Sequence, residues 1–192
     1  MFKPKYVPEI DKSTQELYEY CKNGVEELLG VSLKDVPLRA FNQKFLSDYK
    51  FAIHRRLLRG AGNSIPGLLA AKWQPAQFEF EMNRMSEFAD AYHLHRPEEH
   101  LSECIVLLQY EPNKDYLERK LVHEIAHAAE KRLENLDGME GKVYDTLSEG
   151  FADYVALRMF ADRYSSDRTI IFKSLFPAFV CKCNSIRKRY IC

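Results

Sequence analysis

The chain of 192 residues can form one domain with a substantial core, and its 46% hydrophobic and 29% charged residues are ordinary for a globular protein. Its 28 basic and 28 acidic residues balance, which argues against a nucleic-acid binder despite short basic clusters around Arg55 and Arg187. No apolar run approaches the about 20 residues of a membrane helix, and the N-terminal segment does not resemble a secretory signal. The five cysteines fit reduced thiols better than a disulfide framework, so we expect a cytoplasmic protein without a membrane association.

The first 60 residues predict a helical and strand region. Residues 11–29 place their apolar side chains near one helical face, and Gly30 is a stop signal. Residues 36–41 alternate as a short strand does, and the stretch from 42 to 60 returns to helical periodicity before Gly60.

The middle of the chain predicts extended structure. Residues 68–73 and 76–83 are expected to be strands on either side of Pro75, because the second stretch alternates apolar with acidic side chains. The polar residues 84–100 suggest a short helix. The continuous apolar run at 102–110 has the length of a buried strand, although a buried helical segment would give the same pattern.

The last third of the chain predicts helices. Residues 113–136 are strongly helical in pattern, a second helix is expected at 146–164, and a third at 168–189 with an interruption at Pro177. The order of elements predicts an α+β fold in one domain over residues 1–192, with a small mixed sheet packed on the first of these helices and further helices C-terminal to it.

The sequence LVHEIAH places two histidines four residues apart, with a glutamate directly after the first. On an α-helix, residues four apart lie on nearly the same face, so His123 and His127 can bind one ion without bending the backbone. Glu124 is offset to the side, where its carboxylate can act on a water molecule as the general base of a zinc protease does. The motif therefore predicts a zinc site.

A catalytic zinc needs a third protein ligand, and SEGFADY supplies a candidate. Glu149 and Asp153 are four residues apart on a predicted helix, so one carboxylate can bind the metal while the other accepts the ring N–H of a histidine ligand. Asp145, Asp153 itself, and His93 or His95 are the alternatives for the third ligand.

These residues resemble the signature of the gluzincin metallopeptidases, the thermolysin-like and aminopeptidase-like families. The resemblance rests on HEIAH at 123–127 and EGFAD at 149–153, and covers about residues 113–160, with a weaker similarity to the family's edge strand at 76–83. It implies a zincin-like fold with residues 113–160 as the metal-site core. It also implies roles for five residues: His123, His127 and Glu149 as zinc ligands, Glu124 as the base, and Asp153 as a hydrogen-bond partner of a ligand, most plausibly His123.

The expected activity is hydrolysis of a peptide bond in a peptide or protein substrate by a zinc-activated water. Tyr144 and Tyr154 flank the third ligand and are candidates for stabilising the oxyanion. The expected extended structure at 68–83 would hold the substrate by strand addition. Because the chain is short for this family, a regulatory or substrate-presenting protein could complete the cleft.

Two other classes of function remain open in the sequence. The first is a catalytically inactive zincin-fold binding module, against which the intact Glu124 argues, because a structural zinc needs no base beside its ligands. The second is a protease domain associated with nucleic acid through the basic segments around Arg55 and Arg187, which the balanced net charge disfavours.

Overall fold

The computed structural model describes residues 6–61, 64–96, 101–133 and 142–160. The helix expected at 168–189 lies outside the described residues. Within them, the chain forms five helices and a three-stranded mixed sheet, so the predicted α+β class is confirmed. None of the helices in these ranges is long and apolar enough to cross a membrane.

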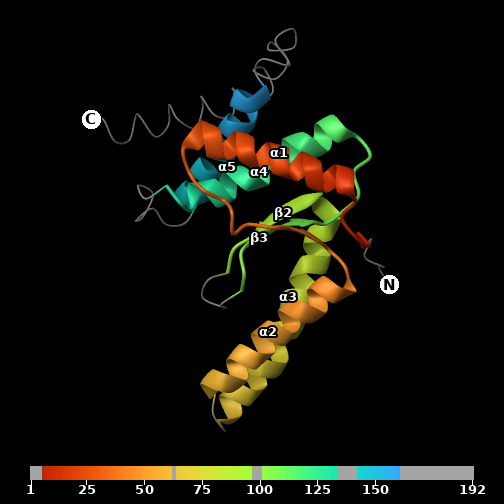
Figure 1. The fold of residues 1–192 in the computed structure, drawn as a ribbon. Coiled ribbons are helices and arrows are strands. Elements are labelled where there is room, and N and C mark those ends of the chain that lie inside the picture. The colour runs from red at the N-terminus through yellow and green to blue at the C-terminus, as the bar shows by residue number, and fades with distance from the viewer. Residues whose placement is uncertain (1–5, 62–63, 97–100, 134–141, 161–192) are drawn as a thin grey trace, which may run out of the picture.

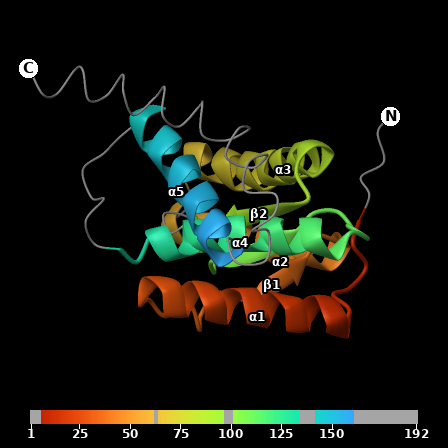
Figure 2. The same ribbon diagram turned by 90° about the horizontal axis from the view of Figure 1, so that it is seen from above.

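The helices lie in two groups around the sheet (Figure 1). One group packs on one face of the sheet, with α4 in contact with both of the other helices (Figure 2); it consists of α1 (Lys12–Leu29), α4 (Lys114–Glu130) and α5 (Lys142–Phe160). The other group is a helical hairpin that reaches away from the sheet as an arm, formed by α2 (Gln43–Ala61) and α3 (Ile65–Phe88).

The sheet has the strand order β1-β3-β2. Its central strand β3 (Cys104–Leu107) pairs in parallel with β1 (Leu38–Ala40) and antiparallel with β2 (Ala91–Leu94). Ile105 packs in the hydrophobic core under α1, α4 and α5, whereas Val106 packs in a second core under the hairpin. Because β3 is buried on both faces, its sequence is an unbroken apolar run, and the strand predicted there is confirmed.

The predictions for the first 60 residues are confirmed in type and order. Helix α1 begins after Asp11, whose carboxylate accepts the backbone N–H of Thr14 at 2.8 Å. It ends at Gly30, which has a left-handed φ of 68° that a residue with a Cβ rarely adopts. Strand β1 and helix α2 then follow as expected.

The strands predicted at 68–73 and 76–83 are wrong, because both stretches belong to the single helix α3. Phe78, Phe80 and Met82 alternate with acidic residues as the side chains of a strand do, but here the alternation comes from a helix with two apolar sides. Phe78 and Met82 are one helical turn apart and are both 1% exposed against α2, whereas Phe80 points away from the hairpin and is 67% exposed. A helix with apolar residues on two sides does not show a clean helical period.

Pro75 lies inside α3, where its missing N–H leaves the carbonyl of Ala71 without its usual helical donor. His54 of α2 replaces that donor, because its Nδ1 lies 3.0 Å from the Ala71 carbonyl oxygen. A carbonyl oxygen only accepts, so Nδ1 carries the proton. The hairpin therefore satisfies the gap in one helix with a side chain from the other.

The short helix predicted within 84–100 is also wrong. Helix α3 continues to Phe88, and the next residues form β2 at the edge of the sheet. Two histidines made this stretch look polar, yet His93 is only 9% exposed and fills a position between the sheet and α4. Tertiary packing thus decides the strand here rather than local propensity.

Candidate metal centre

Helix α4 carries the two histidines of the motif on a rigid support. Asn113 caps the helix by accepting the backbone N–H of Tyr116 at 3.2 Å, and Leu121 and Ile125 anchor its inner side in the core with 0% and 1% exposure. His123 and His127 occupy the neighbouring side of the helix and are half-buried. Their ring positions are therefore set by a well-packed helix rather than by a loop.

The structure brings His123, His127 and Glu149 together. Their nearest atoms form a triangle: the two Nε2 atoms are 3.2 Å apart, and the carboxylate oxygens of Glu149 lie 3.3 Å from Nε2 of His123 and 3.5 Å from Nε2 of His127. Zinc ligands placed at about 2.0–2.1 Å in a tetrahedron are about 3.3 Å from one another. The three side chains thus have the spacing that three ligands of a tetrahedral zinc site would have.

The other ring nitrogens of the histidines are held by hydrogen bonds. Nδ1 of His123 lies 3.2 Å from Asp153, and Nδ1 of His127 lies 3.0 Å from the hydroxyl of Ser148. That hydroxyl donates to the buried carboxylate of Glu130 at 2.5 Å. Because a carboxylate only accepts, and Ser148 has used its one proton, both Nδ1 atoms must be the donors.

This arrangement of protons leaves both Nε2 atoms as bare lone pairs when the histidines are neutral. They face each other, with the carboxylate of Glu149 opposite them. Three electron-rich atoms at such distances repel one another unless a proton or a metal cation lies between them. The cluster could therefore hold a metal ion.

The acid–base properties of the two rings also indicate room for a positive charge. Burial alone would lower the pKa of His123, but the hydrogen bond to Asp153 and the nearby carboxylates raise it overall. Burial, and then the neighbouring His123, lower the pKa of His127 to about 4. Without metal, the pair therefore takes up one further proton, on His123, rather than two, and His127 stays neutral, as a metal ligand must be.

Glu124 lies beside the cluster and is fixed by the sheet. Its Oε2 accepts the backbone N–H of His93 in β2 at 2.8 Å. Burial raises the pKa of the Glu124 carboxyl to about 7, an effect that the neighbouring His123 and the bond from His93 oppose. A carboxylate with a pKa near neutrality is well suited to take up and release a proton at physiological pH.

The cluster opens into a cleft of about 520 Å³. One wall of the cleft comes from α4 and α5, with both ligand histidines, Glu124 and Glu149, and the other comes from β2 and the end of α3. Side chains two residues apart on a strand point the same way, so His93 and His95 of this wall face α4 together. The cleft thus places the candidate metal cluster opposite the edge strand of the sheet.

His93 and His95 form a second group of ionisable side chains with Glu103. Nε2 of His93 lies 2.6 Å from Glu103, whose carboxylate also receives Arg132 at 2.9 Å, and Arg132 reaches Asp35 at 2.8 Å. Burial would raise the pKa of Glu103, but the bonds from His93 and Arg132 outweigh it and lower the pKa to about 2. Because Arg132 already neutralises Glu103, we interpret this network as the support that holds His93 and thereby Glu124.

The other residues predicted as ligands or oxyanion stabilisers lie away from the two histidine Nε2 atoms or outside the described side chains. Asp153 lies behind His123 rather than at the ligand triangle, and His93 and His95 belong to the network with Glu103, so the structure places Glu149 alone of these beside both histidines. Tyr154 is 55% exposed and does not line the cleft. The side chains of Tyr144 and Asp145 lie outside the described residues.

Sequence reasoning missed Ser148 and Glu130, which hold His127. Glu130 is three residues after His127 and on the same helical side, which is a signal that could have been used; its 2% exposure is unusual for a glutamate. Ser148 directly precedes Glu149, but its role depends on how α5 meets α4 and has no sequence signal.

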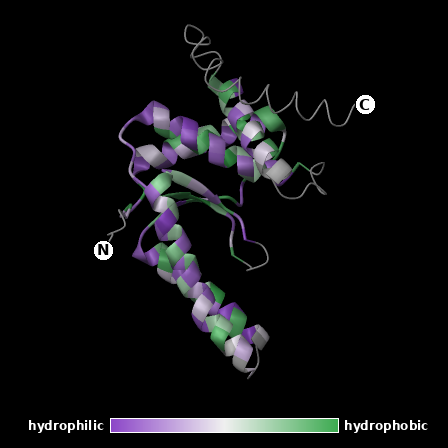
Figure 3. Cartoon of the chain, turned by 180° about the vertical axis from the view of Figure 1, so that it is seen from behind, coloured by the Kyte–Doolittle hydropathy of each residue, from purple (hydrophilic) through white to green (hydrophobic). Residues whose placement is uncertain are grey.

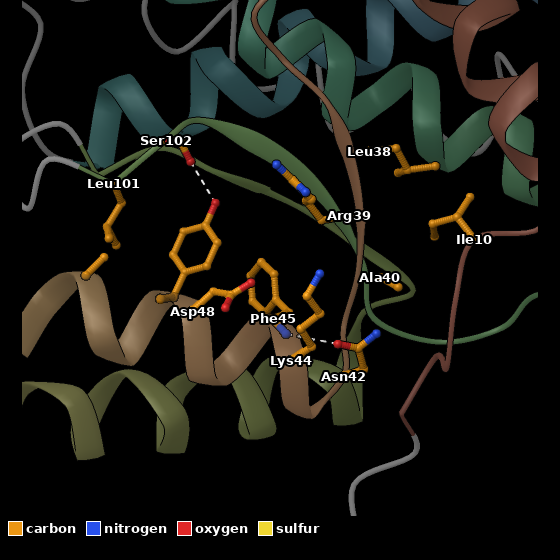
Figure 4. A pocket seen from close by; sticks show the side chains of 12 residues that line it. Ile10, Leu38, Arg39, Ala40, Asn42, Lys44, Phe45, Asp48, Leu101 and Ser102 are labelled. Carbon is orange, nitrogen blue, oxygen red and sulfur yellow. Dashed lines mark hydrogen bonds between the residues drawn. The ribbon is translucent and has the colours of Figure 1, made fainter.

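A further cavity of about 420 Å³ lies between β1 and α2, on the other side of the molecule's sheet (Figure 4). Its hydrogen bonds are structural: the hydroxyl of Tyr49 donates to the backbone carbonyl of Ser102, and the side chain of Asn42 accepts the backbone N–H of Phe45. The described residues of this cavity include no histidine or cysteine. The chemistry therefore concentrates in the cleft at α4.

Comparison of the chain with protein-family models, curated proteins and solved structures found no match.

Asp153→Asn should weaken zinc binding about 10- to 100-fold, because the amide cannot match the carboxylate as an acceptor for Nδ1 of His123. Competition with a chromogenic chelator measures the affinity. Asp48→Asn, which changes an exposed carboxylate on α2, is the control and should leave the affinity unchanged. Equal affinities in all three proteins would show that Asp153 does not support the ligand.

Proposed function

We propose that the protein is a zinc-dependent metallopeptidase with a single zincin-like domain, similar to the gluzincins. The observation that carries the proposal is the triangle of His123, His127 and Glu149, whose atoms lie 3.2–3.5 Å apart with their lone pairs converging. Glu124 in the same cleft supplies the base that such an enzyme requires.

In this proposal the chain's own residues divide the work. His123, His127 and Glu149 hold the ion, and a bound zinc would polarise the scissile carbonyl and make the attacking water more acidic. Glu124 takes the proton of that water and passes it to the leaving amine, for which its pKa of about 7 is suitable. Asp153 keeps the ring of His123 in the tautomer that binds metal through Nε2.

The position of strand β2 is evidence for a peptide or protein substrate. It lies at the edge of the sheet and lines the cleft, whereas the stretch at 68–83, which the sequence favours for this role, is helical. Backbone groups alternate along a strand, so those of Ala91 and His93 lie on the edge of β2 turned away from β3. The N–H of His93 is bound by Glu124, which leaves the carbonyl of His93 and the backbone groups of Ala91 for a peptide. An extended peptide could pair there and present its carbonyl to the metal cluster.

Two features support the enzyme over the alternatives. An inactive zincin-fold module would not need Glu124 desolvated beside the ligands, and a structural zinc favours a closed fourth position. A nucleic-acid-associated protease would gather basic residues around the cleft, where only Lys120 and Lys131 are found among the described lining residues. Cys21 and Cys104 are buried thiols, which agrees with the proposed cytoplasmic location.

The metal content of the purified full chain tests the proposal directly. Elemental mass spectrometry should find about one zinc per chain in the wild type and should find it lost in His127→Ala and Glu149→Ala. His54→Asn removes an imidazole on the arm but keeps a side-chain N–H donor for the Ala71 carbonyl, and is the matched control that should keep its zinc. A wild type without zinc after reconstitution would overturn the proposal.

A further inference from the structure

The arm formed by α2 and α3 carries an apolar seam that nothing in the described chain covers. Leu69 is 57% exposed, Trp73 is 72% exposed and Phe80 is 67% exposed, and the small Ala76 between them is exposed as well. Large apolar side chains exposed in one group mark a surface that contacts a partner. Figure 3 shows hydrophobic residues recurring along the arm.

The spacing of these four residues is that of a helix–helix contact. They follow one another at intervals of 4, 3 and 4 residues, the repeat of a coiled-coil seam. With about 100° per residue, they lie within about 60° of one another and about 160° from the side of α3 that packs on α2. That buried side comprises Ala71, Pro75, Phe78 and Met82. Helix α3 therefore has two apolar sides, of which α2 covers one.

We propose that a second copy of this chain covers the seam, with the two α3 helices antiparallel. The seam is complementary to itself in that direction. A twofold axis midway between residues 74 and 75 sets Trp73 opposite Ala76 of the second copy and Leu69 opposite its Phe80, because each pair of numbers has the same sum. The largest side chain thus meets the smallest, as a close-packed contact requires.

The charges of the arm agree with the antiparallel direction. Residues 55–75, toward the tip, contain four Lys or Arg and no Asp or Glu, although the whole chain is neutral. Residues 76–90, toward the base of the arm, contain four acidic residues and one Arg; Glu79 is paired with Lys50 and Glu81 with Arg96, which leaves Glu87 and Asp90 as the acidic charge of the base. Antiparallel pairing brings the cationic tip of each arm beside the acidic base of the other.

The dimensions of the arm allow this pairing. At about 1.5 Å per residue, α3 extends about 14 Å from the axis toward the tip at Ile65 and about 20 Å toward the base at Phe88. Each tip therefore stops short of the other copy's sheet, and the clefts stay open.

A second copy fits the seam better than a bilayer or a nucleic acid. A lipid surface or a strand of phosphates would be repelled by the acidic half of the arm, and neither would need a small residue at Ala76. An antiparallel α3 helix of a second copy would use both the small side chain of Ala76 and the acidic half of the arm.

Analytical ultracentrifugation of the full chain tests the proposal by measuring whether the wild type and two variants, Trp73→Ala and Ala76→Trp, form dimers. The wild type should sediment as a dimer. Trp73→Ala leaves two small residues facing each other, and Ala76→Trp brings two indoles into conflict, so the dimer of each variant alone should dissociate at an about 100-fold higher protein concentration than the wild-type dimer. An equimolar mixture of the two variants should regain the wild-type dimer, because an indole of one variant then faces a methyl group of the other at both contacts.

The controls separate a specific pairing from other effects. Phe51→Ala removes an aromatic ring of α2 that is 64% exposed but outside the seam, and should dimerise as the wild type does. Circular dichroism of each variant should match the wild type, because every altered side chain is exposed. A wild type that is a monomer at all accessible concentrations, or that instead cosediments with anionic vesicles, would overturn the proposal, and so would a mixture that stays monomeric.

Discussion

Replacing Glu124 with Gln is expected to lower the rate of peptide hydrolysis about a thousandfold while zinc stays bound. Gln keeps the shape of the side chain and can still accept the backbone N–H of His93, but it cannot take a proton from the attacking water. General-base catalysis contributes about 10²- to 10⁴-fold, which sets the size of the effect. Cleavage of a proteome-derived peptide library, read by mass spectrometry, measures the loss over many peptide sequences at once.

The control for this experiment is Glu87→Gln, which changes an exposed glutamate on α3 and should leave the rate unchanged. Zinc content must be equal in the three proteins, so that a lost rate reports the base and not the metal. A Glu124→Gln enzyme that retains its zinc and hydrolyses peptides at more than about a tenth of the wild-type rate would contradict the assigned role.

The same substitution should make the zinc-free protein more stable at neutral and alkaline pH. The pKa of the Glu124 carboxyl rises from 4.5 to about 7 on folding, chiefly because burial disfavours its charge. The folded state therefore binds this proton more tightly than the unfolded state does, and the wild type loses stability as the pH rises from 4.5 through 7. Gln carries no charge to bury, so Glu124→Gln should gain up to about 3 kcal/mol above pH 7.

Urea unfolding of both chelator-treated proteins at about pH 4.5 and about pH 8 measures this difference. The two free energies of unfolding should nearly coincide at the lower pH, where the folded state keeps the carboxyl protonated, and diverge at the higher pH. A gap that is the same at both values would show that the charge of Glu124 is not the cause. Loss of function with gain of stability is typical of a residue kept for catalysis.

The helix that carries the two proposed histidine ligands was predictable because its signals are local. His123, Glu124 and His127 are close in the sequence, and Asn113 marks the start of α4. Glu149 and Asp153 were found through their spacing on the next helix, and the structure sets the first beside both histidines and the second behind His123. The spacing in the sequence allowed either carboxylate to be the ligand, and only the packing of α5 against α4 distinguishes the two.

The errors arose where a residue's surroundings are set by distant parts of the chain. The sequence predicts that Phe80 is buried, because Phe80 falls in the same alternating pattern as Phe78 and Met82, but its side chain lies on the outside of the arm. His93 looks like a surface residue and is buried, because its ring faces α4 and contacts Glu103, which Arg132 neutralises. Hydrophobic period and polarity report the packing of a residue only when one side of its element is covered.

The contact between His54 and Ala71 gives the arm a particular way of forming. Helix α3 cannot complete its own ladder of hydrogen bonds at Pro75, so by itself it is expected to break there into two short pieces. The donor arrives only when α2 docks, and it works in both charge states of the ring, because Nδ1 keeps its proton in each. The two helices of the arm should therefore fold and unfold together as one cooperative unit, and protonation of His54 should not break the hydrogen bond that couples them.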